Sequence, residues 1–298
     1  MMLKESNTNS KLALGTVQFG IPYGVSNESG QINSREVGNI LSIARQNGID
    51  TIDTAISYGE SEAVLGRQSL DGISIVTKLP EIPLNCNNIV DWVNSQIEDS
   101  LNRLNISSLD GLLLHKPRQL LGSFGDELYN ALNNLKEGGL VNRIGISIYN
   151  VKELDIFCEK YKYDLIQAPF SVFDRRLTES GWLQYLHEQG TDIHVRSIFL
   201  QGLLLMNEDT RPAKFNRWNN VWNCWDDWLK ETNQYPLDAC LRYALSRPEI
   251  EKVVVGVSSS SDLQEILESS SMDEFFSLPD GLSNIDEELL DPSNWGNL

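Results

Sequence analysis

Short apolar runs alternate with amphipathic segments along most of the chain. The amphipathic segments repeat apolar residues at intervals of three and four, as one face of a helix requires. Clear examples are the stripes Val37, Ile40, Leu41 and Ala44, and Leu128, Ala131, Leu132 and Leu135. The apolar runs between them have the length and the β-branched or leucine-rich content of strands. They cover residues 12–16, 51–55, 74–78, 110–115, 143–148, 165–168, 194–199 and 253–257.

This alternation predicts a parallel sheet whose strands are joined by helical crossovers. Eight units in about 250 residues are the number and size of a closed (β/α)8 barrel. The alternative is an open doubly wound sheet, which normally carries a glycine-rich phosphate-binding turn after an early strand. The sequence contains no G-x-G-x-x-G run. We therefore predict an α/β fold, a TIM barrel, with residues 1–298 as a single domain.

Local signals mark where some of the helices begin and end. Asn33 and Glu36 have the spacing of a capping box, in which each side chain bonds the backbone N–H of the other residue. Gly138 and Gly139 are typical of a helix C-terminus. One helix is therefore expected to begin just after Asn33 and another to end before Gly138.

The connection between the seventh strand and the seventh main helix is a tryptophan-rich insertion. It contains Trp218, Trp222, Trp225 and Trp228, and the first three are spaced as i, i+4 and i+7. One interpretation is an extra helix that packs its aromatic face onto the barrel. The other is a substrate loop, because a connection that follows a strand lies on the active-site face of a barrel. In that loop Trp218 and Trp222 would contact substrate, and both interpretations can hold together.

Composition and charge narrow the class of protein. The chain has 298 residues, of which 41% are hydrophobic and 22% charged, as in ordinary globular proteins. Its net charge of -18 argues against a nucleic-acid partner, which would need a basic surface. No apolar run approaches the roughly 18 residues of a membrane span, and no secretory signal is visible at the start. The scattered cysteines, Cys86, Cys158, Cys224 and Cys240, fit reduced thiols. We expect a cytoplasmic monomer or small homo-oligomer that acts on a small molecule.

Four chemically complementary groups follow three adjacent strands. Asp53 lies in the second strand with Tyr58 just beyond it, Lys78 ends the third, and His115 ends the fourth. A phenol has a pKa of about 10 and needs a nearby cation to give up its proton readily. Lys78 would supply that cation, and Asp53 would orient it. His115 would position a substrate oxygen or share the proton network, so Tyr58 is the predicted general acid.

None of these groups is a source of hydride, so a reduction would need a cofactor. The run "DTAISYGESEAVLG", followed by "TK" and "LLLH", resembles the aldo-keto reductases, and the similarity extends from "LALGT" to "VVVGVSSSSDLQEIL". The resemblance implies a barrel whose catalytic tetrad is Asp53, Tyr58, Lys78 and His115. It also implies reversible reduction of aldehydes and ketones with NADPH or NADH, bound across the top of the barrel without a Rossmann fold.

The resemblance further implies cofactor contacts at the other strand ends. The implied contacts are Gly15, Thr16 and Asp53 at the nicotinamide ribose, Ser147 and Gln167 at the carboxamide, Arg196 at the ring, Gly202 near the pyrophosphate, and Gly256, Ser258 and Asp262 at the adenosine end. The sequence alone favours an ordinary strand-to-loop turn at Gly15 and Gly256. The N-terminal amides of the helix expected from about Ser261 favour an anion in any case.

Three positions depart from the family pattern. Ile148 replaces an asparagine that follows Ser147 in the family, so one carboxamide contact is missing or supplied otherwise. Arg196 stands where an aromatic ring usually stacks on the nicotinamide, and its guanidinium can stack there or reach a substrate carboxylate or phosphate. After the eighth strand, Asp262 is present and basic residues are absent before the helix. An aspartate disfavours a nearby 2′-phosphate, so weak discrimination or an NADH preference is expected.

The variable loops give the substrate contacts. Gln18 and Tyr23 lie in the first loop, in addition to the tryptophans of the insertion. The phrases "GTVQFGIPYG" and "VRSIFLQGLL" resemble a bacterial branch associated with surface-polysaccharide sugar metabolism. A sugar or nucleotide-sugar carbonyl is therefore the first expected substrate and a small aldehyde the second.

The sequence disfavours two other classes of protein. A catalytically silent barrel would bind the cofactor and act as a redox-sensing or regulatory subunit, but it has no need for Lys78 beside Tyr58. A metal-dependent hydrolase is disfavoured, because the histidines, His115, His187 and His194, form no close ligand set at strand ends. No metal is expected.

Overall fold

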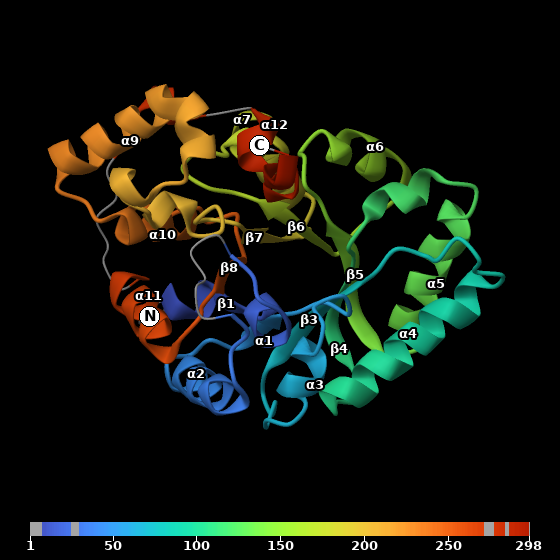
Figure 1. Ribbon diagram of the computed structural model, residues 1–298. Coiled ribbons are helices and arrows are strands. Elements are labelled where there is room, and N and C mark those ends of the chain that lie inside the picture. The colour runs from blue at the N-terminus through green and yellow to red at the C-terminus, as the bar shows by residue number, and fades with distance from the viewer. Residues whose placement is uncertain (1–7, 25–29, 271–276, 284–285, 298) are drawn as a thin grey trace, which may run out of the picture.

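The computed structural model describes residues 8–24, 30–270, 277–283 and 286–297. Within these ranges, eight parallel strands close into a barrel in sequence order, and β8 pairs with β1 (Figure 1). The strands are β1 (Leu12–Gly15), β2 (Thr51–Asp53), β3 (Ser74–Leu79), β4 (Leu109–Leu114), β5 (Val141–Ser147), β6 (Leu165–Pro169), β7 (Asp192–Arg196) and β8 (Lys252–Gly256). The predicted (β/α)8 barrel is confirmed.

Helices surround the barrel (Figure 1). The longer ones are α2 (Ser34–Gln46), α4 (Ile89–Leu104), α5 (Gly125–Glu137), α6 (Glu153–Lys160), α8 (Trp182–Glu188), α9 (Asn219–Thr232), α10 (Pro236–Leu245) and α11 (Ser260–Ser270). Short helices are α1 (Val17–Gly20), α3 (Ser61–Leu65), α7 (Arg176–Glu179) and α12 (Glu287–Leu290). The apolar stripes predicted for α2 and α5 are buried against the barrel. In the part of the chain that is described, no helix combines the length and apolar character that crossing a membrane requires.

The barrel interior is filled by apolar side chains. Val76 of β3, Leu113 of β4 and Leu165 of β6 form a buried cluster separate from the main core. Because β4 and β6 are not neighbours in the sheet, these side chains meet across the lumen. A Cβ atom on Gly145 of β5 would lie only 1.7 Å from the Leu165 carbonyl oxygen, so a side chain is excluded there. The barrel is therefore a packed core, and its polar chemistry is confined to the strand ends.

An ionic cluster lies where the strands begin. Arg143 of β5 forms ion pairs with Asp110 of β4, with Asp192 of β7 at 2.7 Å, and with Glu251 just before β8 at 2.8 Å. His194 Nε2 is 2.9 Å from the same Glu251 carboxylate. These contacts join four strands at the end of the barrel opposite to the predicted site.

The observed β7 starts and ends earlier than the predicted strand 194–199. Asp192 belongs to the strand because it pairs in register with Leu165 of β6, and its side chain binds Arg143. An apolar pattern reveals neither contact. The chain leaves the strand at Ser197, whose φ is 62°, and the following apolar residues curl into a turn with positive φ at Leu200 and Gln201. The apolar run therefore continues past the end of the strand, and its pattern does not mark where the sheet stops.

The tryptophan-rich insertion forms α9, at the periphery of the molecule (Figure 1). Trp218 is 7% exposed and Trp222 is 2% exposed. The Trp222 indole donates to the Phe215 carbonyl, its ring packs on Phe173 at 4.9 Å, and the Trp218 indole donates to Asp286. The helix therefore packs its aromatic face onto the fold. These contacts support the packing interpretation, and the role of Trp218 and Trp222 in binding substrate stays a prediction.

Candidate active site

The ends of β2, β3 and β4 bring the four predicted catalytic side chains together. Lys78 Nζ lies 2.6 Å from Asp53 Oδ1, and both residues are buried, with exposures of 1% and 4%. The Tyr58 and His115 rings meet edge to face with their centroids 5.8 Å apart. Lys78 Nζ is 5.1 Å from the centre of the Tyr58 ring. An acid, an amine, a phenol and an imidazole thus share one small region at the C-terminal face of the barrel.

Asp53 is the centre of a buried chain of polar side chains. Its second oxygen accepts a hydrogen bond of 2.6 Å from Gln167 Nε2 of β6, and Ser147 Oγ of β5 donates to Gln167 Oε1 at 3.0 Å. Lys78 Nζ also donates a hydrogen bond of 2.9 Å to the Thr54 carbonyl oxygen. A buried carboxylate is tolerated only when it is paired and hydrogen-bonded, and these partners satisfy that condition. The chain also fixes the positions of Ser147 and Gln167.

The electrostatics of Tyr58 differ from the sequence expectation. Burial raises the pKa of Tyr58 above its ordinary value, the Asp53 carboxylate raises it further, and the Arg196 guanidinium opposes both. Lys78 lies 5.1 Å from the Tyr58 ring and directs its hydrogen bonds to Asp53 and Thr54. Burial also lowers the pKa of Lys78, against the attraction of Asp53. A phenol is protonated at neutral pH even without this shift, and that is the state that a proton donor needs.

His115 is held as a neutral imidazole. Its Nδ1 atom is 3.1 Å from Ser57 Oγ. Burial, together with the positive charges of Lys78 and Arg196, lowers the pKa of His115 to about 3. A neutral ring can give or accept one hydrogen bond at each nitrogen without carrying charge. His115 is therefore suited to orienting an oxygen atom beside Tyr58.

The lowered pKa of His115 makes protein stability depend on pH. The unfolded chain binds this proton near pH 6.5, whereas the folded protein does so only near pH 3, so His115 costs stability as the pH falls through that window. We expect His115→Asn to lose less unfolding free energy than wild type between pH 6.5 and pH 4.5 in urea titrations. His187→Asn, at an exposed position on α8, is the control and should follow the wild-type curve. If the unfolding free energies of wild type and His115→Asn changed in parallel with pH, the lowered pKa of His115 would be contradicted.

The residues predicted at the ends of β1 and β8 lie side by side. Gly15 and Gly256 are in register in the parallel pair, and Thr16 donates from Oγ1 to the Asp53 carbonyl at 3.0 Å. A Cβ atom on Gly256 would come within 2.9 Å of Gln18 Nε2. The Gln18 Oε1 atom is buried and has no hydrogen-bond partner among the described residues. The unpaired Gln18 Oε1 atom can accept a hydrogen bond, and the glycines leave the backbone beside it uncovered. Gln18, Gly15 and Gly256 therefore fit the polar groups of a dinucleotide cofactor.

The turn from β8 into α11 is organised by Asp262. Its carboxylate accepts hydrogen bonds from Ser258 N at 2.9 Å and from Ser259 Oγ at 2.5 Å. Asp262 thus fills part of the anion-binding capacity that a helix N-terminus offers. The remaining predicted contact, Gly202, has φ of 92° in the turn after β7, which favours glycine.

Arg196 at the end of β7 forms a contact that the sequence did not reveal. Its guanidinium donates to the Ile148 carbonyl at 2.9 Å and to Ser197 Oγ at 3.1 Å, and it lies 4.5 Å from the centre of the Tyr149 ring. Lys116 Nζ approaches the same ring at 5.2 Å. Tyr149 and Lys116 are not among the residues predicted from the sequence. Each directly follows a residue near a strand end, Ile148 or His115, and this position is the signal that could have indicated them.

Tyr23 links the first loop to the turn after β7. Its hydroxyl accepts a hydrogen bond of 2.8 Å from Gln201 Nε2, and the tyrosine is 40% exposed. Gln201 was not predicted, because its position depends on a left-handed backbone (φ 54°) that the sequence does not indicate. Among the predicted substrate contacts, Gln18 of α1 adjoins Gly256 and Tyr23 adjoins the turn after β7, whereas Trp218 and Trp222 are buried in the insertion.

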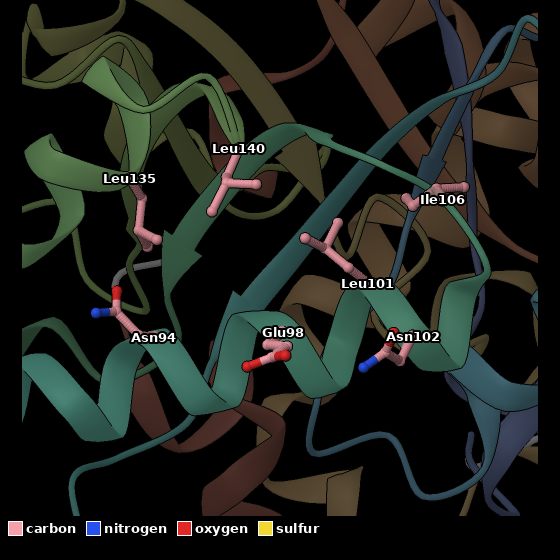
Figure 2. Close-up of a pocket in the computed structure, with 7 residues that line it drawn as sticks. All are labelled: Asn94, Glu98, Leu101, Asn102, Ile106, Leu135 and Leu140. Atoms are coloured by element: carbon pink, nitrogen blue, oxygen red, sulfur yellow. The ribbon is translucent and has the colours of Figure 1, made fainter.

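A separate groove lies between α4 and α5 (Figure 2). It is lined by Asn94, Glu98, Leu101, Asn102, Ile106, Leu135 and Leu140. Ile106 and Leu140 precede β4 and β5, so the groove is near the starts of these strands and away from Tyr58 and Lys78. It contains none of the predicted site residues.

A closed (β/α)8 barrel with polar side chains gathered at its strand C-termini defines a barrel enzyme with its active site on that face. The chain belongs to the aldo/keto reductase family, whose sequence pattern matches residues 11–278. It is 27% identical over 289 residues to the NADH-specific methylglyoxal reductase of Escherichia coli. That alignment covers 87% of this chain and 85% of the relative. Another relative is the aldo-keto reductase YhdN of Bacillus subtilis, with 27% identity. The alignment covers 57% of this chain and 53% of YhdN, so the chain spans about half the length of that relative.

Solved structures share the fold. The holo form of aldo-keto reductase AKR11C1 from Bacillus halodurans has a TM-score of 0.69 and 20% identity, over 90% of this chain and 88% of that one. The glycerol dehydrogenase AKR11B4 from Gluconobacter oxydans has a TM-score of 0.66 and 22% identity, over 91% and 88%. The family resemblance seen in the sequence is confirmed, and the protein is an NAD(P)H-dependent enzyme of carbonyl reduction.

Proposed function

We propose that this enzyme reduces an aldehyde or ketone to the alcohol with Tyr58 as the general acid. The observation that carries the proposal is the buried Lys78–Asp53 pair at 2.6 Å, with Lys78 Nζ 5.1 Å from the Tyr58 ring and His115 at its edge. A bound nicotinamide cofactor supplies the hydride that the side chains lack. Tyr58 donates the proton that completes the hydroxyl group, and like any phenol it is protonated at neutral pH.

The other side chains bind and orient. The positive charge of Lys78 stabilises negative charge that develops on the substrate oxygen, and Asp53 keeps the ammonium in place. The neutral His115 directs the oxygen toward the tyrosine hydroxyl. Ser147 and Gln167 would hold the cofactor carboxamide, since both are buried and already aligned by hydrogen bonds. Arg196 would lie against the nicotinamide ring, where its planar guanidinium can stack.

We further propose that NADH is preferred over NADPH. Support comes from Asp262, whose carboxylate already bonds Ser258 N and Ser259 Oγ at the turn assigned to the adenosine end. The Glu36 carboxylate, which accepts from Ser260 N on the same turn, acts in the same direction. The Escherichia coli relative is named as NADH-specific.

The substrate proposal changes with the structure. Burial of Trp218 and Trp222 argues against the aromatic platform on which a sugar ring would have stacked. Relatives named methylglyoxal reductase and glyoxal reductase favour a small aldehyde. A small aldehyde is therefore the first proposed substrate, and a sugar or nucleotide-sugar carbonyl is the second.

A direct assay separates catalysis from silent cofactor binding. We expect NADH to bind, as a change in its fluorescence on titration with the protein, and to be oxidised when methylglyoxal, glyoxal or a free aldose is added. A preference for NADH over NADPH of about tenfold in kcat/KM is the expected order of magnitude. Binding without oxidation by any carbonyl in such a panel would favour the regulatory alternative. An NADPH preference would contradict the cofactor proposal alone.

A further inference from the structure

A glutamate from α2 reaches the N-terminus of α11. Glu36 Oε1 accepts a hydrogen bond of 2.6 Å from Ser260 N, and Oε2 accepts one of 2.9 Å from Asn39 Nδ2. The predicted capping box is therefore only half formed. Asn33 Oδ1 does accept from Glu36 N at 3.1 Å, but the Glu36 side chain bonds the neighbouring helix instead of the Asn33 backbone.

Two carboxylates therefore act on one turn. Asp262 accepts from Ser258 N and Ser259 Oγ, and Glu36 accepts from Ser260 N, so donors at successive residues of the turn are already used. The two acids come from different helices, α11 and α2. The hydrogen bond from Ser260 lowers the pKa of Glu36, which is consequently ionised at neutral pH. A turn that would otherwise attract a phosphate group instead carries negative charge.

We propose that Glu36 is a specificity-determining residue that excludes a 2′-phosphorylated dinucleotide. The inference rests on the proposed function, in which the turn at Ser258 receives the adenosine end of the cofactor. A 2′-phosphate at this turn would be repelled by the Glu36 carboxylate and would find the Ser260 amide already bonded. A ribose diol carries no charge and can donate to a carboxylate. Glu36 therefore adds to the effect of Asp262, and it does so from a different helix, α2.

A conservative variant separates charge from structure. Glu36→Gln keeps an oxygen that can accept from Ser260 N, so the link between α2 and α11 is preserved while the negative charge is removed. Glu137→Gln removes the same charge at an exposed position near the end of α5 and serves as the matched control. Thermal unfolding of both variants should resemble that of wild type.

The test is the binding of cofactors and of a probe that cannot react. Dissociation constants for NADH and NADPH are measured by fluorescence titration, and those for adenosine 2′,5′-bisphosphate and adenosine 5′-monophosphate by calorimetry. We expect Glu36→Gln to tighten NADPH and the 2′,5′-bisphosphate by about tenfold. NADH and the monophosphate should change by less than about twofold. Glu137→Gln should leave both ratios at the wild-type value.

Several outcomes would overturn the inference. One is a ratio of NADPH to NADH affinity that Glu36→Gln leaves unchanged, and another is a wild-type protein that already binds NADPH more tightly. If Glu36→Gln is unstable, Glu36→Ala is measured in the same way, with the same ratios deciding. A wild-type protein that binds neither dinucleotide would instead refute the proposed function on which the inference rests.

Discussion

Replacing Tyr58 by phenylalanine should lower kcat/KM for aldehyde reduction by about 1,000-fold, within the range that a general acid contributes. The substitution removes one hydroxyl group, while the ring that packs edge to face on His115 remains. Dissociation constants for NADH should stay within about twofold of wild type, because the proposed cofactor contacts are made by other residues. Steady-state kinetics and fluorescence titration measure the two quantities on the same preparations.

Tyr185→Phe is the matched control for this experiment. Tyr185 is 50% exposed on α8 and packs against Trp182, so loss of its hydroxyl should leave kcat/KM unchanged. Near-wild-type reduction by Tyr58→Phe would refute its role as the proton donor. A parallel loss of NADH binding would show instead that the hydroxyl organises the site.

Replacing Asp53 by alanine should lower the free energy of unfolding by about 3–5 kcal/mol, the range observed when one partner of a buried ion pair is removed. The variant leaves the Lys78 ammonium, 1% exposed, and the Gln167 amide without the carboxylate that binds both. Reduction should fall as well, because Lys78 is no longer held beside Tyr58. Urea titrations of wild type and variant give the stability change.

The double variant Asp53→Ala/Lys78→Met distinguishes stability from catalysis. With both charges gone, no ion is left uncompensated, so part of the lost stability should return. Activity should not return, because the cation beside the phenol is absent. A double variant less stable than Asp53→Ala alone would contradict the description of this pair as a charge and its counterion.

The barrel was predictable because its signal is repeated around the chain. Each strand–helix unit carries the same alternation, and an error at one boundary, as at β7, does not change the topology. The clustering of Asp53, Tyr58, Lys78 and His115 was predictable for a related reason, since parallel strands in a barrel bring their C-terminal ends to one face. Their catalytic and cofactor roles, the single domain, the cellular location and the oligomeric state stay predictions.

What the sequence did not reveal depends on contacts between distant segments. The tryptophans of α9 have helical spacing, but spacing does not say which face meets solvent, and here the aromatic face is buried. Gln201 reaches Tyr23 from a turn with left-handed residues. Glu36 has a convincing local partner in Asn33, yet its side chain bonds Ser260, 224 residues away. A local pattern cannot predict which of two available donors a carboxylate selects.

The ionic cluster around Arg143 has a consequence for biosynthesis. A nascent chain that has just emerged past β5 holds Arg143 with Asp110 alone, because Asp192 follows 49 residues later and Glu251 follows 108 residues later. β1 likewise has no partner on one edge until β8, the last strand in the described part of the chain, has left the ribosome. Until then the growing chain exposes an open sheet edge, which can pair with other chains. Translation that stops before residue 252 would therefore yield an aggregation-prone fragment, because the barrel cannot close without β8.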